Sequence, residues 1–528
     1  MVHRSRFPDV AIPDVSLTEY IFAHVADYLD QPALIDGPTG RVVTYRALLH
    51  LTGRVSAALA ARGFGKGSTA CIYSPNVPEY AAIFFGVARI GATNTTANPM
   101  YTAEELGRQL ADSGARIIFT VTPLAERALA AAKATGAPVI VLGEAPGCLP
   151  FAEFIAEGGA SPEGPDVRFP SVPIDSARDI VTLPYSSGTT GLPKGVMLTH
   201  RNVVANLAQC DFIDDSGPGD HTVGFLPFFH IYGMVVILGM VLRKGAAVVT
   251  MPQFDLELYL RINAQYKCRS AYLVPPIALA LAKHPMVDGF DLSHLEMITS
   301  GAAPLGAELE LAVEKRLGCV VKQGYGMTET SPVTHFTPND RALVRHGSCG
   351  LLVANTEVRV VDIRTKRDVG IGEHGELLMR GPQVMKGYLN APEATEEAID
   401  HDGWLHTGDV GYADADGYFF IVDRLKEFIK YKGYQVAPAE LEALLLTHPA
   451  VADAAVIPKA DVEAGEVPKA FIVKRSEITA EEIMAFVAEH AAPYKKVRLV
   501  EFIEKIPKSA SGKILRRELI AAERAKGG

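Results

Sequence analysis

The chain has 528 residues, of which 48% are hydrophobic. This is too long for one core, so we expect at least two globular domains. A net charge of −10 argues against nucleic acid as a partner. The apolar run Ile231–Leu242 is about half as long as a membrane span, so no span is expected. Six scattered cysteines match neither a zinc site nor a disulfide framework, and no signal peptide is evident, which favours the cytoplasm.

The N-terminal part of the chain alternates predicted helices and strands. Apolar residues recur at helical spacing over residues 44–63, and Gly63 is placed to end that helix. The runs STACIY, ARIIFTV and PVIVL have the composition of buried strands, and helical patterns lie between them. This alternation predicts a parallel α/β sheet with helices on its faces.

The stretch YSSGTTGLPKG, residues 185–195, follows a predicted strand and combines hydroxyl side chains, glycines and a lysine. Such a loop suits a polyphosphate, because turned backbone N–H groups and hydroxyls surround an anion. Its residue order differs from that of a P-loop. A flexible linker is the alternative, but Pro193 and the apolar residues that follow argue against it. The predicted phosphate ligands are Ser186, Ser187, Gly188, Thr189, Thr190 and Lys194.

Further along, polar side chains stand at predicted turns. His230 lies in the apolar segment FLPFFHIYG, where a lone histidine is usually a core residue. Thr328 and Glu329 follow the glycine-bracketed tyrosine of QGYGMTE, where they suit a phosphate and its magnesium, or simply cap a helix. Asp409, between glycine-containing turns, suits the two hydroxyls of a ribose.

The C-terminal hundred residues indicate a compact α+β module. Pro438 is placed to begin a helix, and Thr479 with Glu482 forms a capping box before another. Near the end, PKSASGKILRREL places Lys513 on a Ser/Gly loop just before a helix. A solvated surface lysine is the default interpretation of that position.

Taken together, these motifs resemble those of the acyl-adenylate-forming enzymes in almost every part of the chain. The closest likeness is to 4-coumarate:CoA ligases and related bacterial acyl-CoA synthetases, through FFHIYG, SGAAPLG, QGYGMTE and IKYKGYQVAPAELE. The resemblance implies an α/β fold with a large N-terminal AMP-binding domain, residues 1–423, of layered, mostly parallel sheets with helices and a small barrel-like subdomain. A small mobile α+β domain, residues 424–528, would follow it.

The resemblance also implies an acid-thiol ligase that works in two steps. A small-molecule carboxylic acid attacks the α-phosphate of ATP, pyrophosphate leaves, and an acyl-adenylate forms. The thiol of CoA then displaces AMP. The expected cofactors and co-substrates are ATP, Mg²⁺ and CoA, and no carrier domain is expected to be fused to the chain.

Each matching motif implies roles for particular residues. Gln323, Gly324 and Tyr325 would line the adenine, with Thr328 beside them. Asp409 and Arg424 would bind the ribose, and Glu329 would hold the metal. Four positions match catalytic residues of the family, namely Lys513 in the first step, Lys430 and Gln435 in the second, and His230 beside the acyl group; Lys432 and Gly433 match positions near CoA.

The acyl pocket would be lined by Tyr232, Val235, Val236, Gly301, Ala302, Pro332 and Val333. Val235 and Val236 stand where plant coumarate ligases often carry Asn and Ser, and Gln253 stands where they have a CoA-binding lysine. An apolar wall disfavours ring hydroxyls, so cinnamate or another weakly substituted aryl acid competes with coumarate. Two alternatives stay open: a medium- or long-chain fatty acyl-CoA synthetase, and an inactive relative that senses a nucleotide or acyl ligand.

Overall fold

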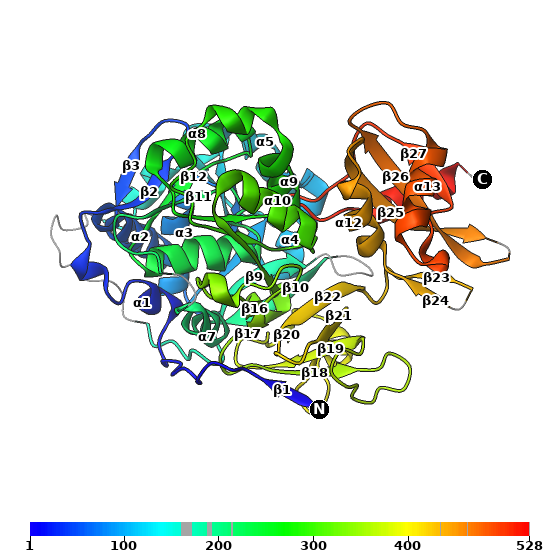
Figure 1. Cartoon of the computed structure of the whole chain (residues 1–528). Coiled ribbons are helices and arrows are strands. Elements are labelled where there is room, and N and C mark those ends of the chain that lie inside the picture. The colour runs from blue at the N-terminus through cyan, green and yellow to red at the C-terminus, as the bar shows by residue number, and fades with distance from the viewer. Residues whose placement is uncertain (160–171, 187–192, 213–214, 433, 462, 527–528) are drawn as a thin grey trace.

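The computed structural model describes residues 1–159, 172–186, 193–212, 215–432, 434–461 and 463–526. Figure 1 shows a large body of layered sheets and helices, with a smaller part, coloured orange to red, standing beside it. The body contains parallel sheets covered by helices, and the smaller part mixes helices with a mostly antiparallel sheet. The α/β fold class expected from the sequence is therefore confirmed. The domain boundary after residue 423 stays a prediction.

The largest sheet has eight strands in the order β20-β10-β9-β5-β4-β6-β7-β8. Neighbours are parallel from β9 to β8, whereas β10 and β20 pair antiparallel at one edge. Every residue of β4 is buried, as expected for a parallel sheet covered on each face. In the same order, the strands span Gly387–Tyr388, Lys194–Thr199, Ile180–Ser186, Thr93–Ala97, Thr69–Tyr73, Ala115–Val121, Val139–Leu142 and Leu149–Pro150.

The helix predicted over residues 44–63 is confirmed as α2, Tyr45–Ala61. Thr44 caps it by accepting the Ala47 N–H at 3.2 Å, and Gly63 follows with φ +73°, which ends the helix. The other α-helices of the body are α1 (Leu17–Ile21), α3 (Glu79–Arg89), α4 (Ala103–Ser113), α5 (Ala125–Ala132), α6 (Phe151–Ala156), α7 (His200–Cys210), α8 (Leu256–Tyr266), α9 (Pro275–Lys283), α10 (Ala307–Leu317) and α11 (Pro392–Ala398). Short 3₁₀ turns are η1 (Val25–Asp27), η2 (Thr122–Leu124), η4 (Pro285–Gly289), η5 (Thr328–Thr330) and η6 (Arg341–Leu343).

Three more sheets complete the body. One has the order β11-β12-β2-β3, namely His221–Gly224, Ala247–Thr250, Pro32–Asp36 and Val42–Thr44. A second runs β13-β14-β15-β16-β17, namely Ser270–Leu273, Met297–Ser300, Val320–Gly326, Val333–Phe336 and Leu351–Leu352. The third is antiparallel, in the order β1-β18-β19-β21-β22, namely Val2–Arg4, Glu357–Val361, Gly375–Arg380, Leu405–Ala413 and Phe419–Arg424. A bridge between Gly350 and Phe419 joins the last two sheets.

The apolar run that begins at Ile231 forms a buried π-helical segment, η3 (Tyr232–Val241). Its side chains pack within the main core of the body, which explains why the sequence is apolar on every side. Within the described ranges, no helix has the length and apolarity needed to cross a membrane.

The smaller part has its own hydrophobic core, built from residues between Ile429 and Val497. As predicted, Pro438 begins a helix, α12 (Pro438–Thr447), and Thr479 and Glu482 form a capping box. The remaining elements are β23 (Ile429–Tyr431), β24 (Tyr434–Val436), β25 (Val451–Asp461), β26 (Gly465–Lys474), α13 (Ala480–His490), η7 (Pro493–Lys495), β27 (Leu499–Phe502) and α14 (Arg516–Ala525).

Arg516 ties α14 to this core through two carboxylates. Its guanidinium lies 2.5 Å from Glu427 and 2.6 Å from Glu442, and burial raises the pKa of Glu442 to about 7. Removing one partner of a buried ion pair is costly, so we expect Arg516→Met to lower the free energy of unfolding of the C-terminal part by about 3 kcal/mol. Hydrogen exchange of β25 and α12 amides would measure the loss. Arg524→Met, at an exposed position of the same helix, should leave the exchange unchanged. An equal rise in exchange in both variants would show that the Arg516 ion pairs do not stabilise this part of the protein.

Candidate active site

The structure brings together three residues predicted to bind the nucleoside. Asp409 on β21 lies directly opposite Arg424 on β22, and its Oδ1 is 3.3 Å from the Arg424 Nε. The hydroxyl of Tyr325, at the end of β15, donates to the other oxygen of Asp409 at 2.5 Å. Asp409 is buried, so its carboxylate depends on these two partners. The result is an oriented acceptor beside an arginine and an aromatic ring.

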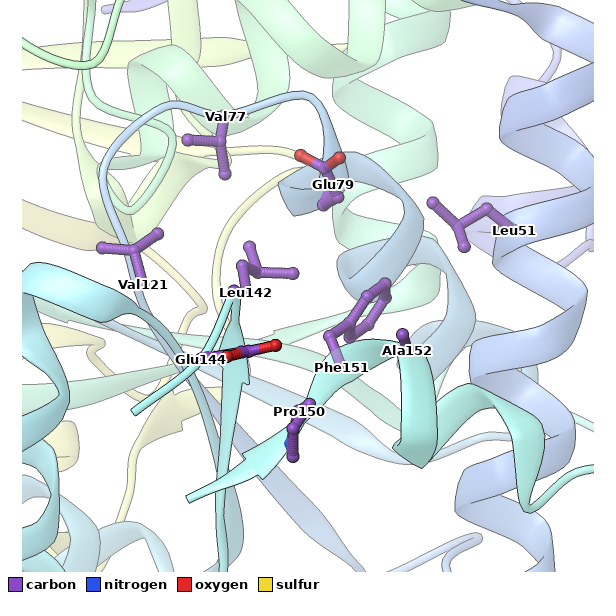
Figure 2. Close-up of a pocket in the computed structure, with 10 residues that line it drawn as sticks. Leu51, Val77, Glu79, Val121, Leu142, Glu144, Pro150, Phe151 and Ala152 are labelled. Carbon is purple, nitrogen blue, oxygen red and sulfur yellow. The ribbon is translucent and has the colours of Figure 1, made fainter. Parts of the chain in front are cut away.

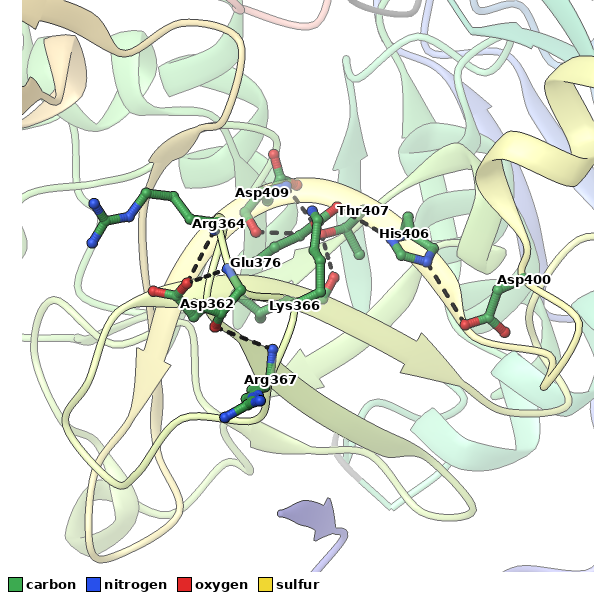
Figure 3. A network of polar contacts seen from close by, with 11 residues as sticks. Asp362, Arg364, Lys366, Arg367, Glu376, Asp400, His406, Thr407 and Asp409 are labelled. Carbon is green, nitrogen blue, oxygen red and sulfur yellow. Dashed lines mark hydrogen bonds and ion pairs between the residues drawn. The ribbon is translucent and has the colours of Figure 1, made fainter.

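Further polar contacts hold the strand that carries Asp409 (Figure 3). The Asp409 N–H donates to the Thr407 hydroxyl at 3.0 Å, and that hydroxyl donates to the Leu377 carbonyl at 2.8 Å. On the same strand, His406 lies between the carboxylates of Glu376 and Asp400, at 3.6 and 3.7 Å. These contacts tie β21 to β19 and to the turn before β21, which keeps Asp409 in place.

Glu329, the predicted metal ligand, is buried, and its Oε1 accepts the Tyr388 hydroxyl at 2.9 Å. The Lys194 Nζ lies 5.2 Å from the centre of the Tyr388 ring. Tyr388 therefore contacts both Glu329 and Lys194, which stands at the end of the predicted phosphate loop. Within the described ranges no cluster of three or more His, Cys, Asp or Glu side chains gathers as a metal site. Magnesium needs only one or two carboxylates beside phosphate oxygens, so Glu329 fits it.

The predicted phosphate loop is described at its two ends. Ser186 and Lys194 face each other across the β9–β10 hairpin. The predictions for Ser187, Gly188, Thr189 and Thr190 lie outside the described residues.

Tyr388 was missed by the sequence analysis. It stands 59 residues from Glu329 along the chain, and no motif includes it. Its contact with Glu329 depends on the pairing of β20 with β10, which local sequence does not reveal.

Lys513 lies close to the same charges although it belongs to the C-terminal part. Burial and then the charge of Arg424 lower the pKa of Lys513 to about 8, and the carboxylates of Asp409 and Glu329 oppose that shift. Its loop is closed by the Ser509 N–H, which donates to the Lys513 carbonyl at 2.8 Å, and by the Lys513 N–H, which donates to the Ser509 hydroxyl at 3.1 Å. Lys513 is therefore no freely solvated surface lysine; it is partly buried near the charges of Arg424, Asp409 and Glu329.

His230 and Tyr232 stand at the entrance to η3. Burial, and then the nearby charge of Lys513, lower the pKa of His230 to about 3, so the imidazole is neutral near pH 7. Its Nδ1 accepts the Tyr232 N–H at 3.3 Å, which leaves Nε2 to carry the proton. The Tyr232 hydroxyl donates to the Thr299 carbonyl at 3.3 Å, so its donor is used within the protein and its oxygen remains an acceptor.

The other predicted acyl residues lie on neighbouring elements. A Cβ added at Gly301 would stand 3.0 Å from the Tyr232 ring, so a side chain at this position would press on that ring. Val235 and Val236 are buried in η3, and Val333 has both its N–H and its carbonyl bound by the Asn206 amide. Ala302 has φ +69°, and Pro332 precedes Val333 in a buried turn.

The side chain of Gln323 is engaged within the protein. Its amide group accepts the Leu305 N–H at 2.9 Å and donates to the Leu305 carbonyl at 2.8 Å. The amide also donates to the buried carboxylate of Glu310 at 2.8 Å. The side chain thus clamps the SGAAPL loop, and only its backbone, with Gly324 and the Tyr325 ring, is left to line an adenine. Thr328 begins η5 directly before Glu329.

The residues assigned to the second step stand elsewhere. Lys430 and Gln435 face each other across the β23–β24 hairpin, and both are exposed. Lys432 is exposed at the turn with φ +46°, and Gly433 lies outside the described residues. Figure 1 shows this hairpin on the side of the C-terminal part away from α9 and α10. The structure therefore does not bring Lys430, Lys432 or Gln435 to the site around Asp409 and Lys513.

A separate cavity of about 630 Å³ opens where β6 and β7 end. Figure 2 shows its mostly apolar lining, with the carboxylates of Glu79 and Glu144 among the side chains. None of the predicted site residues lines it, so it lies apart from the candidate active site. The ten lining residues are Leu51, Val77, Glu79, Val121, Leu142, Gly143, Glu144, Pro150, Phe151 and Ala152.

Comparison with known proteins agrees with this geometry. The AMP-binding enzyme family matches residues 21–389, and the AMP-binding enzyme C-terminal domain matches residues 440–513. The chain therefore belongs to the AMP-binding enzyme family. Among curated proteins it is similar to 4-coumarate–CoA ligase 5 of Oryza sativa subsp. japonica, with 45% identity over 98% of this chain and 97% of the relative.

Solved structures share the whole fold. An anthranilate CoA ligase, AuaEII, in complex with anthranoyl-AMP superposes with a TM-score of 0.87 and 27% identity, over 97% of this chain and 98% of that one. ATP-bound MatB from Rhodopseudomonas palustris gives 0.86 and 27% identity, over 97% and 99%. The apo form of MatB gives 0.76, at the same identity and coverage. The overall structure described here is therefore closer to the ATP-bound form of MatB than to its apo form.

The Gln323 clamp depends on Glu310, whose second oxygen accepts the Gly347 N–H at 2.8 Å. In Glu310→Ala, the buried Gln323 amide and the partly buried Gly347 N–H lose this acceptor, so we expect the loop around Leu305 to lose about 2 kcal/mol of local stability. Hydrogen exchange at the Leu305 and Gly347 amides would measure it. Glu308→Ala, at an exposed position of the same helix, is the matched control and should leave the exchange unchanged. Unchanged exchange in Glu310→Ala would show that Glu310 does not hold the Leu305 loop through Gln323.

Proposed function

We propose that the protein is an AMP-forming acid–CoA ligase that activates an aryl carboxylic acid, of the coumarate or cinnamate type, as an acyl-adenylate and then transfers the acyl group to CoA. The observation that carries the proposal is the position of Lys513 among the charges of Arg424, Asp409 and Glu329. The similarity to a 4-coumarate–CoA ligase over nearly the full chain supports the reaction. The match to an aryl-acid ligase holding anthranoyl-AMP supports the class of acid.

In the first step an anion attacks a polyanion, so positive charge is needed where negative charge develops. Lys513 and Lys194 would supply it. A pKa of about 8 leaves Lys513 mostly protonated at neutral pH, and negative phosphates would favour that form further. Glu329 would hold Mg²⁺, which when bound supplies further positive charge at the phosphate oxygens.

The same site would orient the nucleoside and the acid. The Asp409 carboxylate is placed to accept ribose hydroxyls, with Arg424 beside it, and the Tyr325 ring offers a flat face to the base. His230 is neutral and carries its proton on Nε2, so it can donate to a carboxylate or acyl oxygen without a competing charge. Tyr232, Val235 and Val236 form the apolar wall against which an aryl group would pack.

The second step would use a different face of the C-terminal part. CoA must reach the carbonyl that Lys513 faces during the first step, so that lysine has to withdraw. Lys430, Lys432 and Gln435 are exposed on a hairpin away from the site, which leaves them free to approach after a rotation near Asp423 and Arg424. All six cysteines are free thiols, which supports a proposed cytoplasmic location.

The expected outcome of a substrate panel is CoA-dependent thioester formation, with one AMP and one pyrophosphate per thioester, from cinnamates and other weakly substituted aryl acids. Pyrophosphate, AMP and thioester are measured in parallel, with and without CoA. Medium- and long-chain fatty acids are included, because the apolar wall of Val235 and Val236 also suits aliphatic chains. Reaction with aliphatic acids alone would replace the aryl assignment, and no pyrophosphate from any acid would refute the ligase and leave a ligand-binding role.

Lys513 gives the proposal a pH test. The protonated lysine is the active form, so kcat/KM for ATP in pyrophosphate release, which reports the free enzyme, should fall as pH rises through about 8. Lys513→Ala removes a preorganised charge and should slow this step by about a hundredfold to a thousandfold. Lys513→Arg stays protonated and should lose the decline above pH 8 even if it is slower. A decline that persists in Lys513→Arg would show that another group titrates there.

A further inference from the structure

Helix α9 contacts the C-terminal part at both of its ends. At its last residue, the Lys283 Nζ donates to the Leu446 carbonyl of α12 at 2.9 Å. At its start, Val274 and Pro276 stand 3.1 and 3.6 Å from the place that a Cβ of Gly512 would take. Gly512 is the neighbour of Lys513 in the lysine loop. One helix of the body therefore supports both the catalytic loop and α12, and Figure 1 shows it beside them.

Lys283 provides a hydrogen-bond donor for a backbone carbonyl at the C-terminal end of α12. The last carbonyls of a helix have no partner within the helix. In α12, the Leu444 carbonyl accepts the Thr447 hydroxyl at 2.7 Å, and the Leu445 carbonyl accepts the His448 N–H at 3.1 Å. The Leu446 carbonyl accepts Lys283 from the body. A lysine at this end also complements the helix dipole.

The first turn of α12 is held from the body as well. The helix has no side-chain cap of its own at Ala437. Instead, Asp423 at the end of β22 accepts the Ala439 N–H at 2.9 Å. Between the two ends, the Ala443 methyl lies 3.6 Å from the position of a Cβ at Gly306. Asp423 lies beside the predicted hinge and can follow a rotation, whereas Lys283 is far along the body and cannot.

We infer that Lys283 is a positioning residue that holds the C-terminal part in the arrangement used for acyl-adenylate formation, by capping α12 from the body. This inference rests on the proposed two-step ligase. When the C-terminal part rotates for the second step, the Leu446 carbonyl leaves Lys283, so the bond stabilises one arrangement and not the other. Burial and the nearby charge of Arg475 lower the pKa of Lys283, in keeping with its partly enclosed position.

The test separates the two half-reactions in the full-length protein. Lys283→Met keeps the aliphatic stem and removes the donor, so formation of acyl-AMP from acid and ATP without CoA should slow about tenfold in a single turnover. Thioester formation from prepared acyl-AMP and CoA should change less than about twofold, because that arrangement lacks the bond. Lys283→Arg keeps a donor and should recover most of the first rate. Lys315→Met, an exposed lysine on the adjacent helix α10, is the matched control.

A second measurement needs no substrate. Hydrogen exchange should rise in Lys283→Met at the last turn of α12 and at the loop of Gly512, and not in Lys315→Met. Equal loss in both half-reactions, or unchanged adenylation together with unchanged exchange, would overturn the role of Lys283. Failure of the ligase proposal is distinct: the wild-type protein would then form no acyl-AMP, while the exchange comparison would still decide whether Lys283 holds the two parts together.

Discussion

The site depends on the balance between the cations Arg424 and Lys513 and the carboxylates of Asp409, Glu329 and Glu427. Arg424 and Lys513 approach Asp409 and Glu329 in a partly buried space, where each uncompensated charge is costly. The cost is visible at Lys513, where burial and the charge of Arg424 lower the pKa to about 8. A polyphosphate would relieve this, because it brings negative charge to a place that has two cations prepared for it. The arrangement of these charges is therefore electrostatically complementary to a nucleoside triphosphate.

This constraint links the site to the whole architecture. Asp409 and Arg424 face each other because of the register in which β21 and β22 pair. Contacts of His406 with Glu376 and of Thr407 with Leu377 fix β21 against its other neighbour, β19. Lys513 reaches them only because the C-terminal part rests on α9. Under the proposed two-step mechanism, Lys513 would move with the C-terminal part while Asp409, Arg424 and Glu329 stay on the body.

The proposed acyl pocket depends on close packing, whereas the region around Asp409 and Lys513 depends on charge. Gly301 lets the Tyr232 ring lie against the SGAAPL loop, and Gln323 with Glu310 holds that loop from its far side. The wall near the acyl group is therefore built from backbone and small residues, with η3 supplying Val235 and Val236. A neutral His230 stands at the junction of this wall and the charged region. Its depressed pKa keeps a third cation away from Arg424 and Lys513.

The sequence by itself determined the fold class and the helices with strong periodicity or caps, and it supplied most residues of the candidate site. These features are local: α2 has its threonine cap and terminal glycine, and the motifs around Glu329, Asp409 and Lys513 are short strings. Tertiary structure alone decided which side chains meet. Tyr388 contacts Glu329 because β20 pairs with β10 at the edge of the largest sheet, and the Gln323 amide binds Leu305. Lys430 and Gln435 lie away from the candidate site. Lys283 donates to the last turn of a helix, at a residue 163 positions further along the chain. Such contacts depend on strand register and on the placement of one part against another, which are set by the packing of the whole chain and leave no mark on a local pattern.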